Sequence, residues 1–147
     1  MTTQPAPNWQ VSTLDGSLTP NITDFTGRPT VMFFFNLGCH GCMTRGIPLA
    51  NEIVKQYPEV AVVGIHTNFE GLPHEKPAVL DALQAHDIQF PVFYDDGHAT
   101  YTAYAAGGTP HWILLDEAGN IERSIFGSQL NAVQRLSYAL MQRFPNV

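Results

Sequence analysis

The chain has 147 residues, of which 44% are hydrophobic and 14% are charged, and this balance excludes a disordered or fibrous protein. Seven Lys and Arg residues stand against thirteen Asp and Glu residues, a formal charge of −6, and no basic stretch could neutralise a run of phosphates, so we expect no nucleic-acid partner. At this length one core holds a chain without disulfide staples, and we treat residues 1–147 as one domain.

The N-terminal residues do not match the pattern of a targeting signal. Residues 1–10 contain neither a basic leader nor an apolar stretch of the kind that directs export, so we expect a cytoplasmic protein, with an exported location as the alternative if a leading segment has been removed. The longest apolar run, residues 31–35, is about a quarter of the roughly 20 residues that a membrane span requires. We therefore also expect no membrane span.

Two β elements are predicted in the first quarter of the chain. Asp15-Gly16 lies between residues 9–14 and 17–19, and a turn dipeptide between two short runs predicts a β-hairpin that covers one edge of the sheet. Residues 30–35 are almost wholly apolar and follow Gly27-Arg-Pro29. Such a run is typical of a central strand buried on both faces.

A helix is predicted after that strand. Apolar residues recur at helical spacing from Ile47 to Tyr57, and Pro58 follows as a stop signal. Pro48 lies inside this pattern, where it removes one backbone donor, so we expect a kink there. Residues 60–65 then predict the next buried strand.

Helices and strands alternate in the second half of the chain, and a turn at residues 117–120 predicts an antiparallel hairpin. The predicted order is β-α-β-α-β-β-α, an α/β fold with a central mixed sheet flanked by helices. The predicted ranges are a helix at 79–86, a short segment at 90–94 that leads into a turn, a short helix at 100–105, hairpin strands at 111–115 and 121–126, and a final helix at 130–144.

Cys39 and Cys42 are the two cysteines of the sequence, and they form a Cys-x-x-Cys motif between the first central strand and the next helix. A sulfur at a helix N-terminus faces unpaired backbone N–H groups and the positive end of the helix dipole, so its thiolate form is favoured. Cys39 is therefore the expected nucleophile. Cys42, one turn further along, is the expected resolving thiol, which attacks a mixed disulfide on Cys39.

The two residues between the cysteines are His40 and Gly41. A protonated His40 would stabilise the thiolate and make the pair more oxidising, whereas an exposed turn residue without an electrostatic role is the other interpretation. Gly41 lacks the rigidity that a proline would give this turn. Both interpretations of His40 stay open on the sequence alone.

A structural metal site is the main alternative for the cysteine pair. Closed zinc sites need four ligands, and the sequence has no second cysteine pair. His66 and His111 lie at the end and the start of apolar strands, where hydrogen-bonded histidines are commoner than metal ligands. We therefore expect no metal and no cofactor other than the redox-active pair itself, Cys39 and Cys42.

Thr109-Pro110 is the second informative element. A proline that follows two glycines and precedes a buried strand suits a rigid turn and a cis peptide bond, although a trans turn is the commoner state of an X-Pro bond. A cis bond would leave the backbone of Thr109 free to pair with an extended substrate segment by β-strand addition.

Residues 34–42 (FFNLGCHGC), Pro48 and Gly108-Thr-Pro110 together resemble the thioredoxin-fold redoxins, especially the TlpA/ResA-like thiol-disulfide oxidoreductases. The resemblance spans nearly the whole chain. It implies a thioredoxin-like fold, here with the N-terminal hairpin as an extension. It also implies a nucleophilic Cys39, a resolving Cys42 and a cis Pro110 that faces the substrate with Thr109 beside it.

The sequence departs from this family at several positions. The tryptophan often found before the first cysteine is Gly38 here. The buried acidic residue that assists proton transfer in many members has no counterpart, since Phe33 and Arg45 stand in the corresponding places. Arg45 is either a solvated helix residue or a group that stabilises a thiolate.

The resulting hypothesis is an enzyme, a monomeric thiol-disulfide oxidoreductase that acts on protein or small-molecule disulfides and dithiols and exchanges electrons with an unidentified donor or acceptor. A thiol peroxidase is one alternative, but the pattern Pro-x-x-x-Thr-x-x-Cys is missing, with Met32 and Asn36 at those positions. A copper-binding chaperone is another, because Cu(I) suits thiolates, but the spacing of the cysteines in Sco-like proteins is absent.

Overall fold

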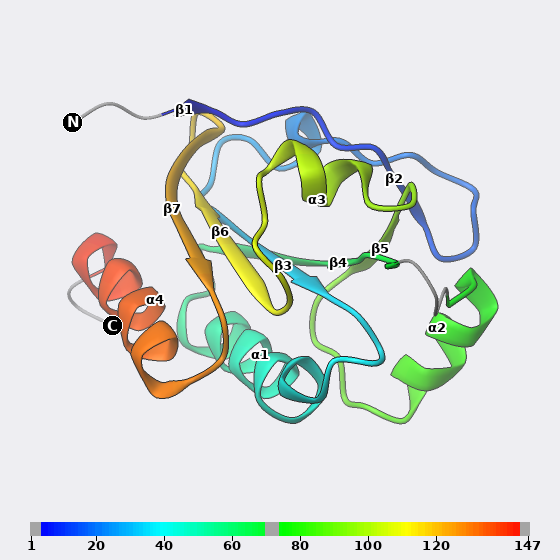
Figure 1. Cartoon of the computed structure of the whole chain (residues 1–147). Helices are drawn as coiled ribbons and strands as arrows, with labels where there is room; N and C mark the ends of the chain where they lie inside the picture. Colours follow the sequence, from blue (N-terminus) through cyan, green and yellow to red (C-terminus); the bar gives the residue numbers. More distant parts are fainter. Residues whose placement is uncertain (1–3, 70–73, 145–147) are drawn as a thin grey trace.

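A computed structural model describes residues 4–69 and 74–144. A seven-stranded sheet with the order β1-β7-β6-β3-β4-β5-β2 forms its middle layer (Figure 1). Strands β3, β4 and β5 run parallel, and the other pairings are antiparallel, so the predicted mixed sheet is confirmed. The strands are β1 (Gln4–Pro5), β2 (Val11–Thr13), β3 (Thr30–Phe35), β4 (Ala61–His66), β5 (Val92–Asp95), β6 (His111–Leu115) and β7 (Asn120–Phe126).

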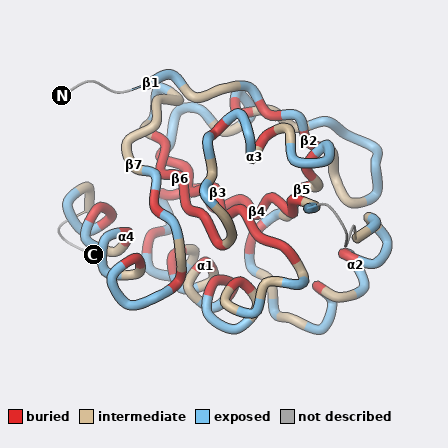
Figure 2. The backbone as a smooth tube through the Cα atoms, in the orientation of Figure 1, coloured by how far each residue is buried: buried red, intermediate tan, exposed pale blue. Residues whose placement is uncertain are grey.

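Strand β3 lies at the centre of the sheet, and all six of its residues are buried. Phe33 and Phe35 belong to the core on one face, and Met32 and Phe34 belong to the core on the other. A strand covered on both faces needs apolar side chains on both, which is why its sequence is a continuous apolar run. Figure 2 shows the buried residues concentrated in these middle strands.

Helices cover both faces of the sheet (Figure 1). Helices α1, α2 and α4 pack on the face that carries Phe33, and α3, η1 and the N-terminal segment pack on the face that carries Phe34. On this second face the Trp9 indole N–H donates to the Tyr104 hydroxyl (3.0 Å). The helices are η1 (Ile22–Asp24), η2 (Cys42–Gly46), α1 (Ile47–Gln56), α2 (Lys76–Gln84), α3 (Ala99–Ala103) and α4 (Leu130–Arg143).

The predicted N-terminal hairpin is wrong. The turn at Asp15-Gly16 does form, because the Gly16 N–H donates to the Thr13 carbonyl oxygen (2.9 Å) and the Thr13 N–H donates to the Leu18 carbonyl oxygen (2.9 Å). Residues 17–19 form no strand, however, and β2 pairs along its length with β5. Strand β1 pairs with β7 at the opposite edge of the sheet. The edge of β5 thus supplies the backbone hydrogen-bond partners of β2, and the edge of β7 supplies those of β1, in place of a local hairpin. The segment at 90–94, predicted only to lead into a turn, contributes to β5.

The helix that follows the cysteines begins with a π-helical turn. Segment η2 continues directly into α1, and the Ile47 N–H donates to the carbonyl oxygen of Cys42, five residues earlier. Pro48 has no N–H, and a proline ring clashes with the carbonyl four residues before it in a regular α-helix. A wider turn avoids this clash, so the predicted kink at Pro48 takes the form of a π-turn that starts at Cys42.

Candidate active site

The side chain of Asn36 holds the turn that carries the cysteines. The Gly38 N–H donates to Asn36 Oδ1 (2.8 Å), and the Asn36 amide donates to the carbonyl oxygen of Thr67, just beyond β4 (2.8 Å). Asn36 and Thr67 are buried, so removing the Asn36 side chain would leave the Thr67 carbonyl without this hydrogen bond in a place shielded from water, and it would also release the Gly38 N–H. We did not single out Asn36 for this role from the sequence, although an Asn that follows a strand and precedes a glycine is a turn signal.

Cys39 and Cys42 form a disulfide, with Cα atoms 5.2 Å apart. Cys39 is partly exposed, whereas Cys42 is fully buried. The backbone N–H of Cys42 donates to Cys39 Sγ (3.2 Å), and an N–H aimed at this sulfur stabilises negative charge on it after reduction. The pair therefore has one sulfur that a substrate can reach and one that is protected.

The peptide bond between Thr109 and Pro110 is cis, as predicted. The Gly127 N–H donates to the Pro110 carbonyl oxygen (2.8 Å), which fixes this loop against the end of β7. The Thr109 carbonyl oxygen lies 3.4 Å from Cys39 Sγ, although 70 positions separate the two residues. The fold thus brings the predicted residues Cys39, Thr109 and Pro110 together where β3 ends and β6 begins.

Gly108 and Phe126 border the same loop. Gly108 has a φ of +144°, and a Cβ added to it would lie 2.5 Å from Phe126 Cε1, so the ring is in close contact with the glycine. The Phe126 side chain is 55% exposed. An exposed aromatic ring beside the cis peptide offers an apolar contact to a substrate. The sequence did not single out Phe126, because it was one apolar residue among several in a predicted strand.

The structure places His40 and Arg45 on the outer side of this turn, where both are exposed. The carbonyl oxygen of His40 accepts a hydrogen bond from the Thr44 hydroxyl (2.8 Å), and Arg45 Nε donates to Ser128 Oγ (3.1 Å). Phe33 is buried and stacks on Trp112, with ring centroids 4.5 Å apart. Phe33 and Arg45 stand where the resembled family often carries a buried acid, so neither of these two positions supplies a carboxylate here.

His66 supports the turn from behind. The Leu37 N–H donates to His66 Nε2 (3.2 Å), and within the described residues the buried Nδ1 has no hydrogen-bond partner. The ring stacks on that of Tyr94, with centroids 5.9 Å apart, and meets His74 edge to face. Burial, together with the nearby His74, lowers the pKa of His66 to about 4. The imidazole is therefore neutral near pH 7 and can accept the Leu37 hydrogen bond.

His111 supports the second loop of the site in the same way. The Gly107 N–H donates to His111 Nδ1 (3.3 Å), which leaves Nε2–H to donate to Ser124 Oγ (2.7 Å). Burial lowers the pKa of His111 and favours the neutral ring. The prediction that His66 and His111 are hydrogen-bonded histidines of the core is confirmed.

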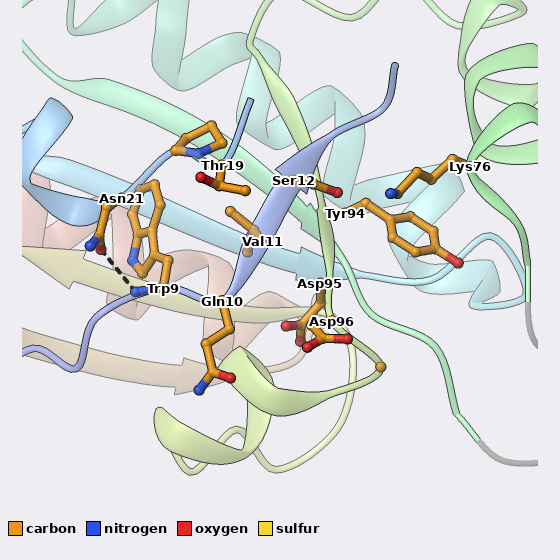
Figure 3. Close-up of a pocket in the computed structure, with 12 residues that line it drawn as sticks. Trp9, Gln10, Val11, Ser12, Thr19, Asn21, Lys76, Tyr94, Asp95 and Asp96 are labelled. Atoms are coloured by element: carbon orange, nitrogen blue, oxygen red, sulfur yellow. Dashed lines mark hydrogen bonds between the residues drawn. The ribbon is translucent and has the colours of Figure 1, made fainter. Parts of the chain in front are cut away.

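A surface pocket of about 520 Å³ lies along the edge of the sheet where β2 pairs with β5. Figure 3 shows Trp9, Val11 and Tyr94 lining it, with the Lys76 side chain over the Tyr94 ring, 5.5 Å from its centroid. The lining residues include neither the cysteines nor the Thr109 loop. This pocket is therefore separate from the redox pair.

Two further findings concern the part of the chain that the structure describes. Within residues 4–69 and 74–144, no helix has both the length and the apolar character needed to cross a membrane. Over the same ranges, no cluster of three or more His, Cys, Asp or Glu side chains is placed to hold a metal ion.

The chain belongs to the AhpC/TSA family, whose model matches residues 2–124. Two curated relatives are thiol-disulfide oxidoreductases. YkuV of Bacillus subtilis is 26% identical over 95 residues, 64% of this chain and 64% of YkuV, so the match spans just under two thirds of that relative. ResA of Geobacillus thermodenitrificans is 26% identical over 123 residues, 84% of this chain and 68% of ResA. The resemblance to these redoxins inferred from the sequence is confirmed.

Solved structures confirm the thioredoxin-like fold. The thioredoxin-like superfamily protein SPOA0173 is 33% identical, with a TM-score of 0.79 over 93% of this chain and 95% of that one. The exposed lipoprotein thioredoxin Etrx1 of Streptococcus pneumoniae is 17% identical, with a TM-score of 0.74 over 90% of this chain and 99% of that one. At this lower identity the likeness concerns the fold alone.

The expected cytoplasmic location is contradicted by the relatives. Etrx1, which shares the fold of this chain, is named as an exposed lipoprotein. The expectation rested on the first ten residues, but leaders and anchors lie outside a folded domain and leave its core pattern unchanged.

Proposed function

We propose that this protein is a thiol-disulfide oxidoreductase in which Cys39 exchanges disulfides with the substrate and Cys42 resolves the intermediate. The observation that carries the proposal is the position of Cys39 Sγ, partly exposed and 3.4 Å from the Thr109 carbonyl oxygen beside a cis peptide bond. The buried Cys42 behind it and the activity named for both curated relatives support the same assignment.

The reaction needs only the two sulfurs. In the reductive direction the Cys39 thiolate attacks one sulfur of a substrate disulfide, a bond forms between Cys39 and that sulfur, and the other substrate sulfur leaves as a thiolate that takes up a proton. Cys42 then loses its proton and attacks Cys39 Sγ. This step forms the Cys39–Cys42 disulfide and releases the second substrate thiolate, so two electrons pass to the substrate. An external dithiol returns the pair to the reduced state.

The proposed substrate is a disulfide in an extended polypeptide segment. The backbone of Thr109, next to Cys39, would pair with this segment by β-strand addition, and the exposed ring of Phe126, in contact with Gly108, would add an apolar contact. A protonated His40, exposed in the turn, would add positive charge near the thiolate. No cofactor enters this scheme.

Turnover of insulin disulfides with dithiothreitol as the electron donor tests the proposal. The wild-type protein should accelerate insulin reduction, and Cys39→Ser should lower the rate to that of dithiothreitol alone. The same preparations are assayed for consumption of hydrogen peroxide, which separates disulfide exchange from the peroxidase alternative. Equal insulin reduction by wild type and Cys39→Ser, or rapid peroxide turnover without insulin reduction, would overturn the assignment.

A further inference from the structure

The side chains of Arg45 and Ser128, which come from different elements, lie close to the backbone of Gly41 between the two cysteines. A Cβ added to Gly41 would lie 2.8 Å from Ser128 Oγ and 3.0 Å from Arg45 Nη2. These distances are shorter than ordinary contacts of a side-chain carbon, so the two groups occupy the space that any other residue at position 41 would fill. Arg45 comes from η2, and Ser128 comes from the turn between β7 and α4.

A hydrogen bond fixes the guanidinium at this place. Arg45 Nε donates to Ser128 Oγ (3.1 Å), and Ser128 is 5% exposed, so its hydroxyl is a firm anchor on a neighbouring element. An unanchored arginine on a helix surface would spread its charge over many rotamers. Here the charge is held beside the Cys-x-x-Cys turn, whose Cys42 N–H already points at Cys39 Sγ.

We propose that Arg45, anchored by Ser128 over Gly41, is a positioning residue that favours the ionised form of Cys39 and so shifts the pair toward the dithiol state. The inference rests on the proposed role of Cys39 as the nucleophile. A fixed cation near a thiolate stabilises it, and stabilising the thiolate stabilises the reduced protein relative to the disulfide. Gly41 has its own part in this arrangement, because a side-chain carbon at position 41 would displace the guanidinium and the Ser128 hydroxyl from where they lie.

The first test compares reduced wild type with Arg45→Gln in the pH dependence of alkylation by iodoacetamide, with the labelled cysteine identified by mass spectrometry. We expect the pH at which Cys39 is half ionised to rise, and the thiolate fraction below that pH to fall about two- to threefold, the size typical of an exposed charge pair. In glutathione buffers above that pH, the equilibrium should move toward the disulfide by the same factor, about 9–14 mV in reduction potential.

Matched variants separate charge from structure. Arg45→Lys keeps the charge and should restore part of the effect, and Arg135→Gln removes an exposed arginine from α4 and should leave the alkylation profile unchanged. Gly41→Ala should displace the guanidinium and raise the half-ionisation pH as Arg45→Gln does. In the Arg45→Gln background the alanine should add little, because the group it displaces is already gone.

The outcomes distinguish this inference from the proposed function. Labelling of Cys39 with the same half-ionisation pH in wild type and Arg45→Gln would overturn the role of Arg45 and leave disulfide exchange standing. Additive effects of Gly41→Ala and Arg45→Gln would also overturn it, because the alanine would then act by another route. Preferential labelling of Cys42 would overturn both proposals.

Discussion

The backbone N–H of Leu37 donates a hydrogen bond to Nε2 of the buried His66, 3.2 Å away. This contact joins the turn that carries Cys39 to the last residue of β4. A protonated imidazole has two N–H donors and no acceptor, so the bond requires the neutral ring. The lowered pKa of His66 keeps it neutral at every pH above about 4.

The stability of the protein should therefore depend on His66 at mildly acidic pH. The pKa of His66 is about 4 in the folded protein, whereas the ordinary value for a solvent-exposed histidine, as in the unfolded chain, is 6.5. Between these values the unfolded chain binds a proton that the folded chain does not. The contribution of His66 to stability is fully present above pH 6.5 and is lost progressively as the pH falls toward 4.

Urea unfolding of wild type and His66→Gln at several pH values checks this expectation. Between pH 7 and pH 4.5 the wild type should lose about 2 kcal/mol more of its free energy of unfolding than the variant does. His98→Gln, a change at an exposed histidine, serves as the control and should follow the wild type. Parallel curves for wild type and His66→Gln would show that His66 does not set the acid sensitivity.

Replacing Asn36 by alanine should loosen the turn of the site. The variant loses the hydrogen bonds to the Gly38 N–H and the Thr67 carbonyl, and in a buried position this costs about 2 kcal/mol of unfolding free energy. Chemical denaturation measures the loss, with Asn131→Ala on the exposed side of α4 as the control. Similar stabilities of the two alanine variants would contradict the role given to Asn36.

Substitution by alanine should have different effects on stability at Gly46 and at Gly107. A Cβ at Gly46 would lie 2.7 Å from Phe33 Cζ in the core, whereas a Cβ at Gly107 meets no atom within 4 Å. Gly46→Ala should lower the melting temperature, at a cost of about 1–3 kcal/mol from overpacking, and Gly107→Ala should leave it nearly unchanged. A melting temperature of Gly46→Ala equal to that of the wild type would mean that the ring of Phe33 moves aside freely.

Truncation of Phe126 should affect large substrates more than small ones. If its exposed ring contacts a polypeptide, Phe126→Ala should raise the KM for insulin about three- to tenfold, with little change in the rate of exchange with oxidised glutathione. Tyr138→Ala, which removes an exposed ring from α4, is the matched control. Equal losses toward both substrates would assign Phe126 a structural role.

The sequence predicted the parts of the site whose signals are local. A Cys-x-x-Cys between a buried strand and a helix, and a Thr-Pro before another strand, each carry their chemistry in a few adjacent residues. The expectation that these two segments lie together, as Cys39 Sγ and the Thr109 carbonyl oxygen do, came from the resemblance to a known fold. The core strands were equally predictable, because continuous apolar runs identify them.

What the sequence could not predict depends on contacts between distant residues. The partner of β2 is β5, some 80 positions away, and no local pattern distinguishes that pairing from a hairpin. The supporting role of His66 depends on its bond to Leu37, and the anchor of Arg45 depends on Ser128. Asn36 stood in a recognisable turn position, but its second bond, to Thr67, is again long-range.

Trapping of the mixed disulfide tests the central assignment most directly. Reduced Cys42→Ser is incubated with a peptide that contains one disulfide, and the adduct is located by mass spectrometry. The assignment predicts a stable adduct on Cys39, and no adduct with Cys39→Ser under the same conditions, because the buried Cys42 is shielded from the peptide. An adduct on Cys42 in the Cys39→Ser variant, or none on Cys39 in the Cys42→Ser variant, would contradict it.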